Sequence, residues 1–165
     1  MLHRIISYTL AGLVEHQLDG RAWVQGYRFR RLPGEYIRGQ AGCISVVNHE
    51  HQEILVADAA FKRLHGFYIA HEFGHVVDFR SQHALTLSFH TSIGSDLENG
   101  IPAAGYWLSH NGESNLGEAT ADAFGLWIMM TYEDYRPIFA GTPLDTRFTD
   151  IVDEIEESLD SLATP

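Results

Sequence analysis

The sequence is poor in cysteine, in basic residues and in long hydrophobic runs, and each shortage excludes a class of protein. Its single cysteine, Cys43, rules out an internal disulfide framework. This favours the cytoplasm and leaves export without a cleaved signal peptide open. The net charge of −11 argues against nucleic acid as a partner. No apolar run approaches the roughly 20 residues that a membrane-spanning helix requires, so no membrane partner is expected either.

The 165 residues, 45% of them hydrophobic, are enough for one domain over residues 1–165 with a sizeable core. The spacing of apolar residues predicts a helix over residues 2–18, which lacks the clean apolar segment of a signal peptide. Alternation predicts a strand over Ala22–Leu32. Two apolar stretches, Cys43–Val47 and Ile54–Ala57, predict a hairpin or two successive strands.

Three further helices are expected in the rest of the chain. Asp58 is a candidate N-cap for a long helix over residues 59–80, and another helix should run from near Asn115 to Tyr132. The last begins at Thr142-Pro143, where proline suits the first helical position. Its apolar face comprises Leu144, Phe148, Ile151, Val152, Ile155, Leu159 and Leu162. With the strands, these helices predict an α+β fold in which a small mixed sheet packs on helices.

The most informative stretch is the pentapeptide His71-Glu72-Phe73-Gly74-His75, inside the helix expected over residues 59–80. Residues four apart share one face of a helix, so the two imidazoles can converge on a tetrahedral cation such as Zn²⁺. Glu72 is adjacent to the first histidine and can take a proton from a metal-bound water without being a ligand. This is the metallopeptidase interpretation of H-E-x-x-H.

The alternative is that the motif occurs by chance, because a histidine pair on a helix often has no metal-binding role. The apolar neighbours favour a buried helix instead: Phe67, Ile69, Ala70, Phe73, Val76 and Val77. Burying two histidines and a glutamate there is costly unless something satisfies them, and a metal ion does so. A second pair, His49 and His51, lies in a polar turn and is interpreted as exposed and outside the site.

The third metal ligand has to come from elsewhere in the chain, since a catalytic zinc usually has three protein ligands. The local extension of the motif, with a glycine and then a histidine after His75, is absent. Glu118 is the best candidate, with Asp122 four residues later on the same helix face to orient a ligand histidine. A capping box with Asn115 is the alternative role for Glu118, but it leaves Asp122 unexplained.

These motifs resemble the gluzincin metallopeptidases over about residues 60–130. Glu118-Ala-Thr-Ala-Asp-Ala-Phe-Gly125 is similar to the second-helix motif of the thermolysin type. His71-Glu-Phe-Gly-His-Val-Val-Asp78, with the long gap that follows it, looks more like the compact catalytic domains related to anthrax lethal factor. The resemblance implies a single zincin-like domain that acts as a zinc-dependent endopeptidase on a peptide or protein substrate.

By position, the resemblance implies that the zinc ligands are His71, His75 and Glu118. It makes Glu72 the general base and Asp122 the carboxylate that supports a ligand histidine. It also implies that a strand ahead of the metal helix holds extended substrate by edge pairing. Ile54–Ala57 or Cys43–Val47 would serve. For the group that stabilises the oxyanion, the candidates near Glu118 are Tyr106 and His110, and neither matches the family pattern cleanly.

Two other functions fit parts of the sequence. Gly42-Cys43-Ile44-Ser45 resembles the cysteine-ligand motif of peptide deformylases, in which case Cys43 would replace Glu118 as a ligand. The glycine- and glutamine-containing N-terminal motif of that family is absent. The other possibility is a zincin fold used as a non-catalytic binding or regulatory module, although a pure binder has no need of Glu72. The oligomeric state does not follow from composition.

Overall fold

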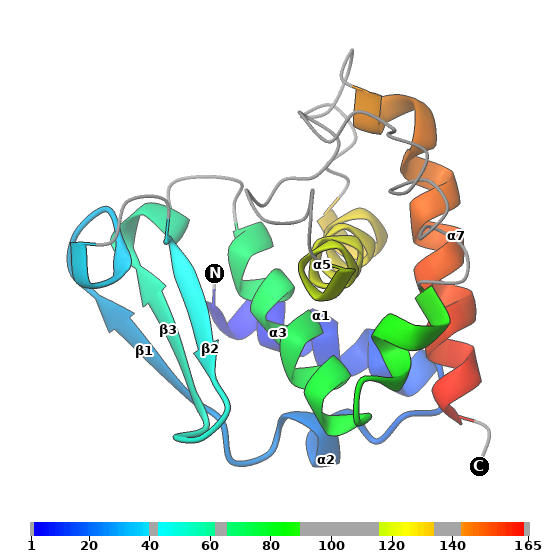
Figure 1. The fold of residues 1–165 in the computed structure, drawn as a ribbon, viewed down its shortest axis with the longest axis horizontal. Coiled ribbons are helices and arrows are strands. Elements are labelled where there is room, and N and C mark those ends of the chain that lie inside the picture. Colours follow the sequence, from blue (N-terminus) through cyan, green and yellow to red (C-terminus); the bar gives the residue numbers. More distant parts are fainter. Residues whose placement is uncertain (1, 40–42, 62–65, 90–115, 134–142, 164–165) are drawn as a thin grey trace.

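The structure is a computed structural model that describes residues 2–39, 43–61, 66–89, 116–133 and 143–163. Its elements, in chain order, are α1 (Leu2–Glu15), α2 (Gly20–Val24), β1 (Arg28–Leu32), η1 (Ile37–Gly39), β2 (Ser45–Asn48), β3 (Glu53–Ala57), η2 (Asp58–Phe61), α3 (Phe67–Arg80), α5 (Leu116–Glu133) and α7 (Pro143–Ala163). Residues 84–89 are also helical. The expected α+β fold is confirmed, with a small mixed sheet on one side of the helices (Figure 1).

The sheet contains three described strands in the order β1-β3-β2. The expected hairpin is confirmed, because β2 and β3 pair antiparallel with Val47 opposite Ile54. β1 joins the other side of β3 in parallel, with Phe29 opposite Ile54. Because β3 has a strand on each side, Ile54–Ala57 has no free edge for a peptide. Of the two candidate strands, only β2 lies at an edge of the described sheet.

The strand expected over Ala22–Leu32 begins later than predicted. The Asp19 carboxylate accepts hydrogen bonds from the backbone N–H groups of Arg21 and Ala22, at 3.1 and 3.2 Å, and so caps the short helix α2. The chain then turns at Gly26, whose φ of +90° favours glycine, and β1 starts at Arg28. The predicted strand was therefore wrong for the first part of Ala22–Leu32, because the Asp19 cap starts a helix there.

The helix that contains the H-E-x-x-H motif also starts later than predicted. Asp58 does not cap it: its carboxylate accepts hydrogen bonds from Arg31 Nε at 2.6 Å and from the Gly34 N–H at 3.3 Å. Asp58 opens the short helix η2 instead. α3 begins at Phe67 after Gly66, which has φ of 111° and provides no side-chain cap. The prediction failed because a tertiary partner on β1 takes up the carboxylate.

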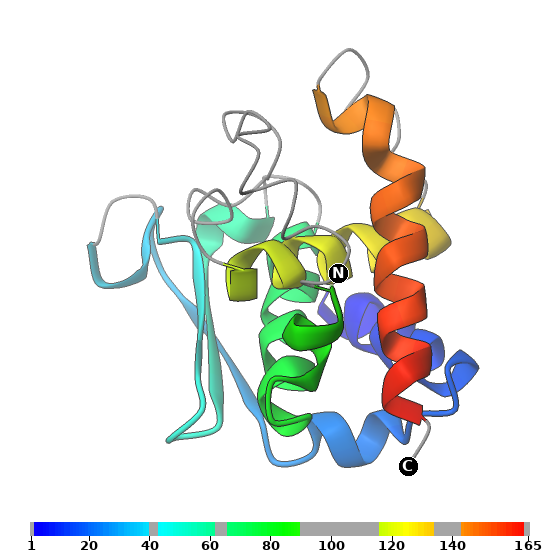
Figure 2. The ribbon, with the colours of Figure 1, turned by 45° about the vertical axis from the view of Figure 1, so that its right-hand side comes forward.

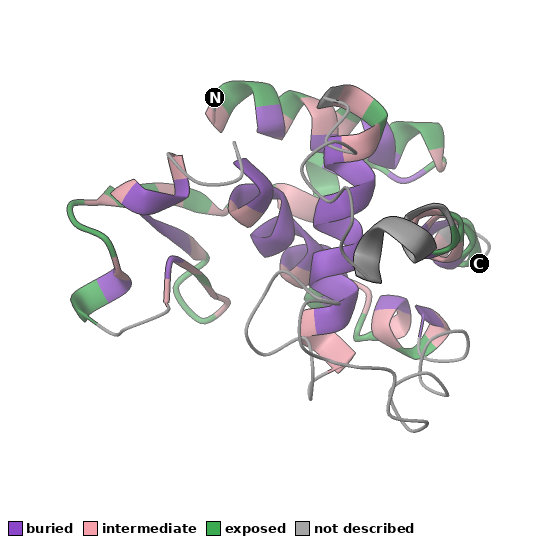
Figure 3. Cartoon of the chain, turned by 90° about the horizontal axis from the view of Figure 1, so that it is seen from above, coloured by how far each residue is buried: buried purple, intermediate pink, exposed green. Residues whose placement is uncertain are grey.

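α3 and α5 form the centre of the core (Figure 3). α3 packs against α5, the sheet and α1, so most of its residues between Phe67 and Asp78 are buried. On α5, every residue from Ala119 to Met129 is buried. The helix expected from near Asn115 to Tyr132 is thus confirmed, and polar groups on either helix lie in an apolar interior.

Two glycines allow α3 and α5 to approach closely. A Cβ added at Gly74 would lie 2.8 Å from the Cα of Ala121, and one at Gly125 would lie 2.8 Å from Cε2 of Phe67. Distances this short are essentially never seen between real Cβ atoms and their neighbours. Small residues on both sides of Asp122, among them Ala121 and Ala123, are typical of a helix that packs closely against another, and these contacts show α5 packed in this way against α3.

The first and last helices cover this core. The helix expected over residues 2–18 is confirmed, although α1 ends at Glu15. α7 lies across α5 (Figure 2), and its Ile151, Ile155 and Leu159 are fully buried, as the apolar pattern predicted. The side chains of Leu144 and Phe148 lie outside the described part of the structure. No helix among the described residues combines the length and the apolarity needed to cross a membrane.

Candidate metal centre

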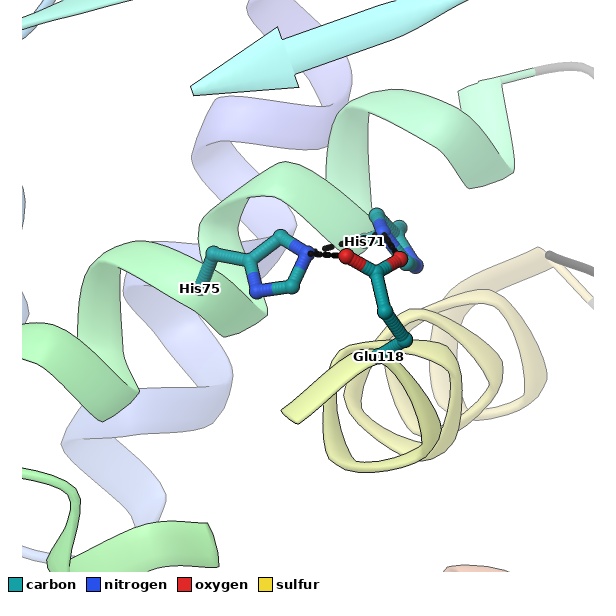
Figure 4. Close-up of side chains that lie close together, drawn as sticks. All are labelled: His71, His75 and Glu118. Carbon is teal, nitrogen blue, oxygen red and sulfur yellow. Dashed lines mark hydrogen bonds and ion pairs between the residues drawn. The ribbon is translucent and has the colours of Figure 1, made fainter. Parts of the chain in front are cut away.

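The structure brings His71, His75 and Glu118 together where α3 meets the start of α5 (Figure 4). The two histidines stand one helical turn apart, and their Nε2 atoms face each other at 3.1 Å. The Glu118 carboxylate approaches from α5, with Oε2 3.5 Å from His71 Nε2 and Oε1 3.4 Å from His75 Nε2. Side chains from two separate segments therefore converge on one point.

The spacing of these atoms suits a tetrahedral cation. With metal–ligand distances of about 2.0–2.1 Å, neighbouring ligand atoms of a tetrahedral zinc site are about 3.3–3.4 Å apart. The separations of 3.1, 3.4 and 3.5 Å in the cluster lie close to this length. Two imidazole nitrogens and one carboxylate oxygen are also ligand types that zinc accepts. Within the described residues, this is the one group of three potential ligands close enough to hold a metal ion.

Asp122 supports the cluster from behind. It is fully buried, and its Oδ1 accepts a hydrogen bond from His71 Nδ1 at 2.8 Å. An ionised carboxylate can only accept, so Nδ1 carries the hydrogen and Nε2 faces the cluster. The carboxylate therefore fixes both the tautomer and the orientation of the ring, as was expected of this residue.

The charges of the cluster are strongly coupled. Burial alone would lower the pKa of His71, but hydrogen bonds to Asp122 and Glu118 outweigh it and raise the pKa to about 10. Hydrogen bonds from His71 and His75 in turn hold the pKa of Glu118 far below its usual range. In the metal-free protein, a proton on His71 thus lies between two carboxylates. A cation at the same point would replace that proton.

Zinc binding should therefore release about one proton at neutral pH, because Nε2 of His71 must lose its hydrogen to become a ligand. With a His71 pKa of about 10, the apparent zinc affinity should rise by about tenfold per pH unit between pH 7 and 9. Competition with a chromophoric chelator measures the slope, and calorimetry in two buffers counts the protons. An ordinary histidine, with a pKa of about 6.5, would give a plateau above pH 7, which is the contrary result.

Glu72 lies next to the cluster and is only 3% exposed. Its negative charge helps to raise the pKa of both His71 and Cys43, which places its carboxylate within electrostatic reach of the two groups. A buried carboxylate that acts electrostatically on a ligand histidine is a candidate for proton exchange with a molecule bound at the cluster. This is compatible with the general-base role implied by the motif.

Cys43 lies near the site but outside the ligand cluster. Its Sγ donates a hydrogen bond to the carbonyl oxygen of Ser45 at 3.6 Å. Burial raises the pKa of the thiol, and the charges of Glu72 and Glu118 raise it further. Glu118 is a member of the cluster of potential ligands and Cys43 is not, so the described geometry favours Glu118 over Cys43 as the third ligand.

Some predicted residues cannot be placed, and some nearby residues were missed. Tyr106 and His110, the oxyanion candidates, lie outside the described residues, as does Asn115, the alternative cap partner of Glu118. His49 was interpreted as exposed, but it lines a pocket beside the cluster. The pocket also includes His83, which no motif had indicated.

Comparison of the chain with protein-family models, with curated proteins and with solved structures found no match. The resemblance to gluzincins therefore rests on the two sequence motifs alone. What the protein does must be argued from that geometry.

Proposed function

We propose that the protein is a zinc-dependent endopeptidase of the gluzincin type. The convergence of His71, His75 and Glu118, with Asp122 behind His71, supports this most directly. Both halves of the paired motif thus contribute to one ligand set, although they come from different helices. A surface histidine pair would not need a buried carboxylate from another helix to orient it.

A bound zinc ion would supply Lewis acidity and make a coordinated water more acidic. Side chains and backbone groups of the protein would transfer the proton and bind the substrate. Glu72 accepts a proton from the attacking water and passes it to the leaving amine. β2 has no strand on its outer side among the described residues, and Ser45 Oγ donates a hydrogen bond to the Tyr68 carbonyl oxygen of α3 at 3.4 Å. This edge would offer backbone groups to an extended peptide. Tyr106 and His110 stay candidates for the oxyanion.

The proposed partners follow from the same features. The substrate is a peptide or protein, and the net charge of −11 makes nucleic acid an unsuitable one. The single cysteine suits a reducing compartment, so the proposal places the enzyme in the cytoplasm.

The proposal is tested by incubating the zinc-loaded protein with a peptide library and identifying new termini by mass spectrometry. Cleavage should stop when a chelator removes the metal and return when zinc is added back. A protein that retains no divalent ion, or a zinc-loaded protein that cleaves nothing in the library, would sink the proposal.

A deformylase-like metallohydrolase is the second candidate, because Cys43 lies within electrostatic reach of Glu72 and Glu118 and so close to the cluster. Metal retention separates the two ligand sets. Cys43→Ser should keep bound zinc, whereas Glu118→Gln should weaken zinc binding by at least about tenfold, since it removes the anionic ligand. Metal analysis after dialysis against a weak chelator measures both. Loss of zinc from Cys43→Ser with retention in Glu118→Gln would reverse the assignment.

A further inference from the structure

β1 forms the outer edge of the sheet, on the side opposite to β2 (Figure 1). Along its inner side it pairs in parallel with β3, and the N–H of Arg28 bonds to the Gln52 carbonyl oxygen at 2.8 Å. Backbone groups of successive strand residues point to opposite sides, so Arg28 and Arg30 direct theirs to β3. Phe29 and Arg31 therefore direct their N–H and C=O groups away from the sheet. Within the described residues, no backbone bond and no strand covers these groups.

The side chains of β1 differ between its two faces. Phe29 lies on the face towards α3, where its partly buried ring packs on Phe73 with centroids 5.3 Å apart. Arg28 and Arg30 lie on the opposite face, because side chains alternate along a strand, and both are exposed. Neither forms an ion pair with another described residue, whereas Arg31 does. Two positive charges thus lie beside an open row of backbone groups.

A strand added at this edge would contact both features at once. Its backbone would bond to the outward groups of Phe29 and Arg31, as in peptide recognition by strand addition. Directly opposite side chains of neighbouring strands lie about 4.5–5.5 Å apart on one face, so acidic residues would suit the positions beside Arg28 and Arg30. The residues between them would lie beside Phe29, where an apolar side chain covers the exposed part of the ring. The edge therefore fits an extended segment in which acidic and apolar residues alternate.

The chain's own described segments do not fit this edge. Charges on an edge strand commonly prevent pairing between copies of a chain, and β1 of a second copy would place arginine opposite arginine. The other edge strand, β2, contains no charged residue to match them. The acidic residues of α7 belong to a helix and do not form a strand. The charge of the arginines repels these copies but attracts an acidic strand from a different protein.

We propose that the outer edge of β1 is a docking site for an extended segment of a partner protein in which acidic residues alternate with apolar ones. The segment adds to the sheet as a further strand, and its carboxylates contact the guanidinium groups of Arg28 and Arg30. The site lies across the sheet from β2 and includes no residue of the ligand cluster. The inference is therefore independent of the proposed peptidase function.

The experiment measures the binding of labelled synthetic peptides to the full chain by fluorescence anisotropy. A peptide in which glutamate alternates with valine should bind at least about tenfold more tightly than one in which lysine alternates with valine, since opposite-charge pairs replace like-charge pairs. A peptide with all its glutamates first and all its valines last should also bind about tenfold more weakly, because its carboxylates cannot share one face. Equal binding of the three peptides, or no binding of the alternating one, would overturn the proposal.

Pairing with the backbone of β1 is tested with two N-methylated forms of the alternating peptide. Methylation at the glutamates blocks one edge of the peptide, and methylation at the valines blocks the other. One form should lose affinity by at least about tenfold and the other should keep it, because only one edge of an added strand faces β1. In the complex, the N–H groups of Phe29 and Arg31 should exchange with solvent at least about tenfold more slowly by NMR. Loss of binding in both forms, or in neither, would refute strand addition.

Arg30→Glu tests the charge contact, and Arg21→Glu is the matched control at an exposed position on α2. Arg30 is chosen because its neighbour on β3 is Leu55, whereas Arg28 stands opposite Glu53. Arg30→Glu should weaken binding of the alternating glutamate peptide by about tenfold, and Arg21→Glu should stay within about twofold of wild type. Both variants should keep the wild-type Tm. Equal weakening in both would mean that net charge alone governs binding and would refute the site.

Two further measurements separate other occupants and the metal centre. The peptide should bind without changing the oligomeric state measured by sedimentation. A dimer that the peptide dissociates would make a second copy the occupant and overturn the proposal. Peptide affinity should be the same in zinc and in chelator, so the docking site can stand where the peptidase proposal fails. Binding that requires zinc would place the peptide at the metal centre and not on β1.

Discussion

Replacing Glu72 by glutamine should reduce peptide cleavage by about 10²–10⁴-fold while the protein keeps its zinc, because general-base catalysis contributes about this much. Glutamine has almost the same shape as glutamate but cannot take a proton from water. Glutamine fills the same buried space, and Glu72 is not a member of the ligand cluster, so the variant should keep its fold and its three metal ligands. The measurement is the cleavage rate of a library-derived peptide at equal zinc occupancy.

The matched control is Glu53→Gln, which makes the same chemical change on β3, away from the cluster, and should leave the rate unchanged. A Glu72→Gln protein that cleaves as fast as wild type would show that another group acts as the base. A variant that loses zinc would give Glu72 a structural role. Equal absence of cleavage in wild type and variant would favour the non-catalytic binding module.

Asp122→Ala should affect both stability and metal binding, because Asp122 is the buried partner of a buried imidazole. Removing one member of a buried pair costs about 3–5 kcal/mol, so the free energy of unfolding of the metal-free protein should fall by that order. The His71 ring also loses the group that fixes its tautomer. Zinc affinity should therefore fall by about 10–100-fold. Denaturant titration and chelator competition measure the two effects.

Asp122→Asn refines this prediction, because the amide keeps the shape and can still accept a hydrogen bond from His71. It should lose less stability than Asp122→Ala, yet the loss of charge should lower the pKa of His71 and flatten the pH dependence of zinc binding. Asp153→Asn, at an exposed position on α7, is the matched control and should change neither property. Zinc affinity of Asp122→Ala within about twofold of wild type would contradict a supporting role for this carboxylate.

The parts of the site that follow helical periodicity were predictable from the sequence. Spacings of four residues placed His71 with His75, and Glu118 with Asp122, on shared faces of two helices. The small residues next to Asp122 also indicated that these helices would lie close together. The two pairs come together because α3 and α5 pack closely at Gly74. A local sequence pattern does not predict which residue of α5 faces this glycine.

The errors arose where a local signal competed with a distant one. Asp58 has the chemistry of an N-cap, but Arg31 from another strand takes its carboxylate. Asp19 is an equally ordinary cap and does start a helix, because no such competitor intervenes among its described contacts. The parallel pairing of β1 with β3 has no turn signal to reveal it. The pocket was missed for a related reason, since His49 and His83 come from different elements and meet only in the fold.

The separation of the ligand helices along the chain has a consequence for folding kinetics. Residues 81–115 lie between α3 and α5, so bringing Glu118 to the histidines closes a long loop. The chain loses the conformational entropy of this loop before the contact can form. A cation that bridges the two helices can bind only after the loop has closed. Bound zinc should therefore slow unfolding far more than it speeds folding, because it stabilises the folded state and not the transition state.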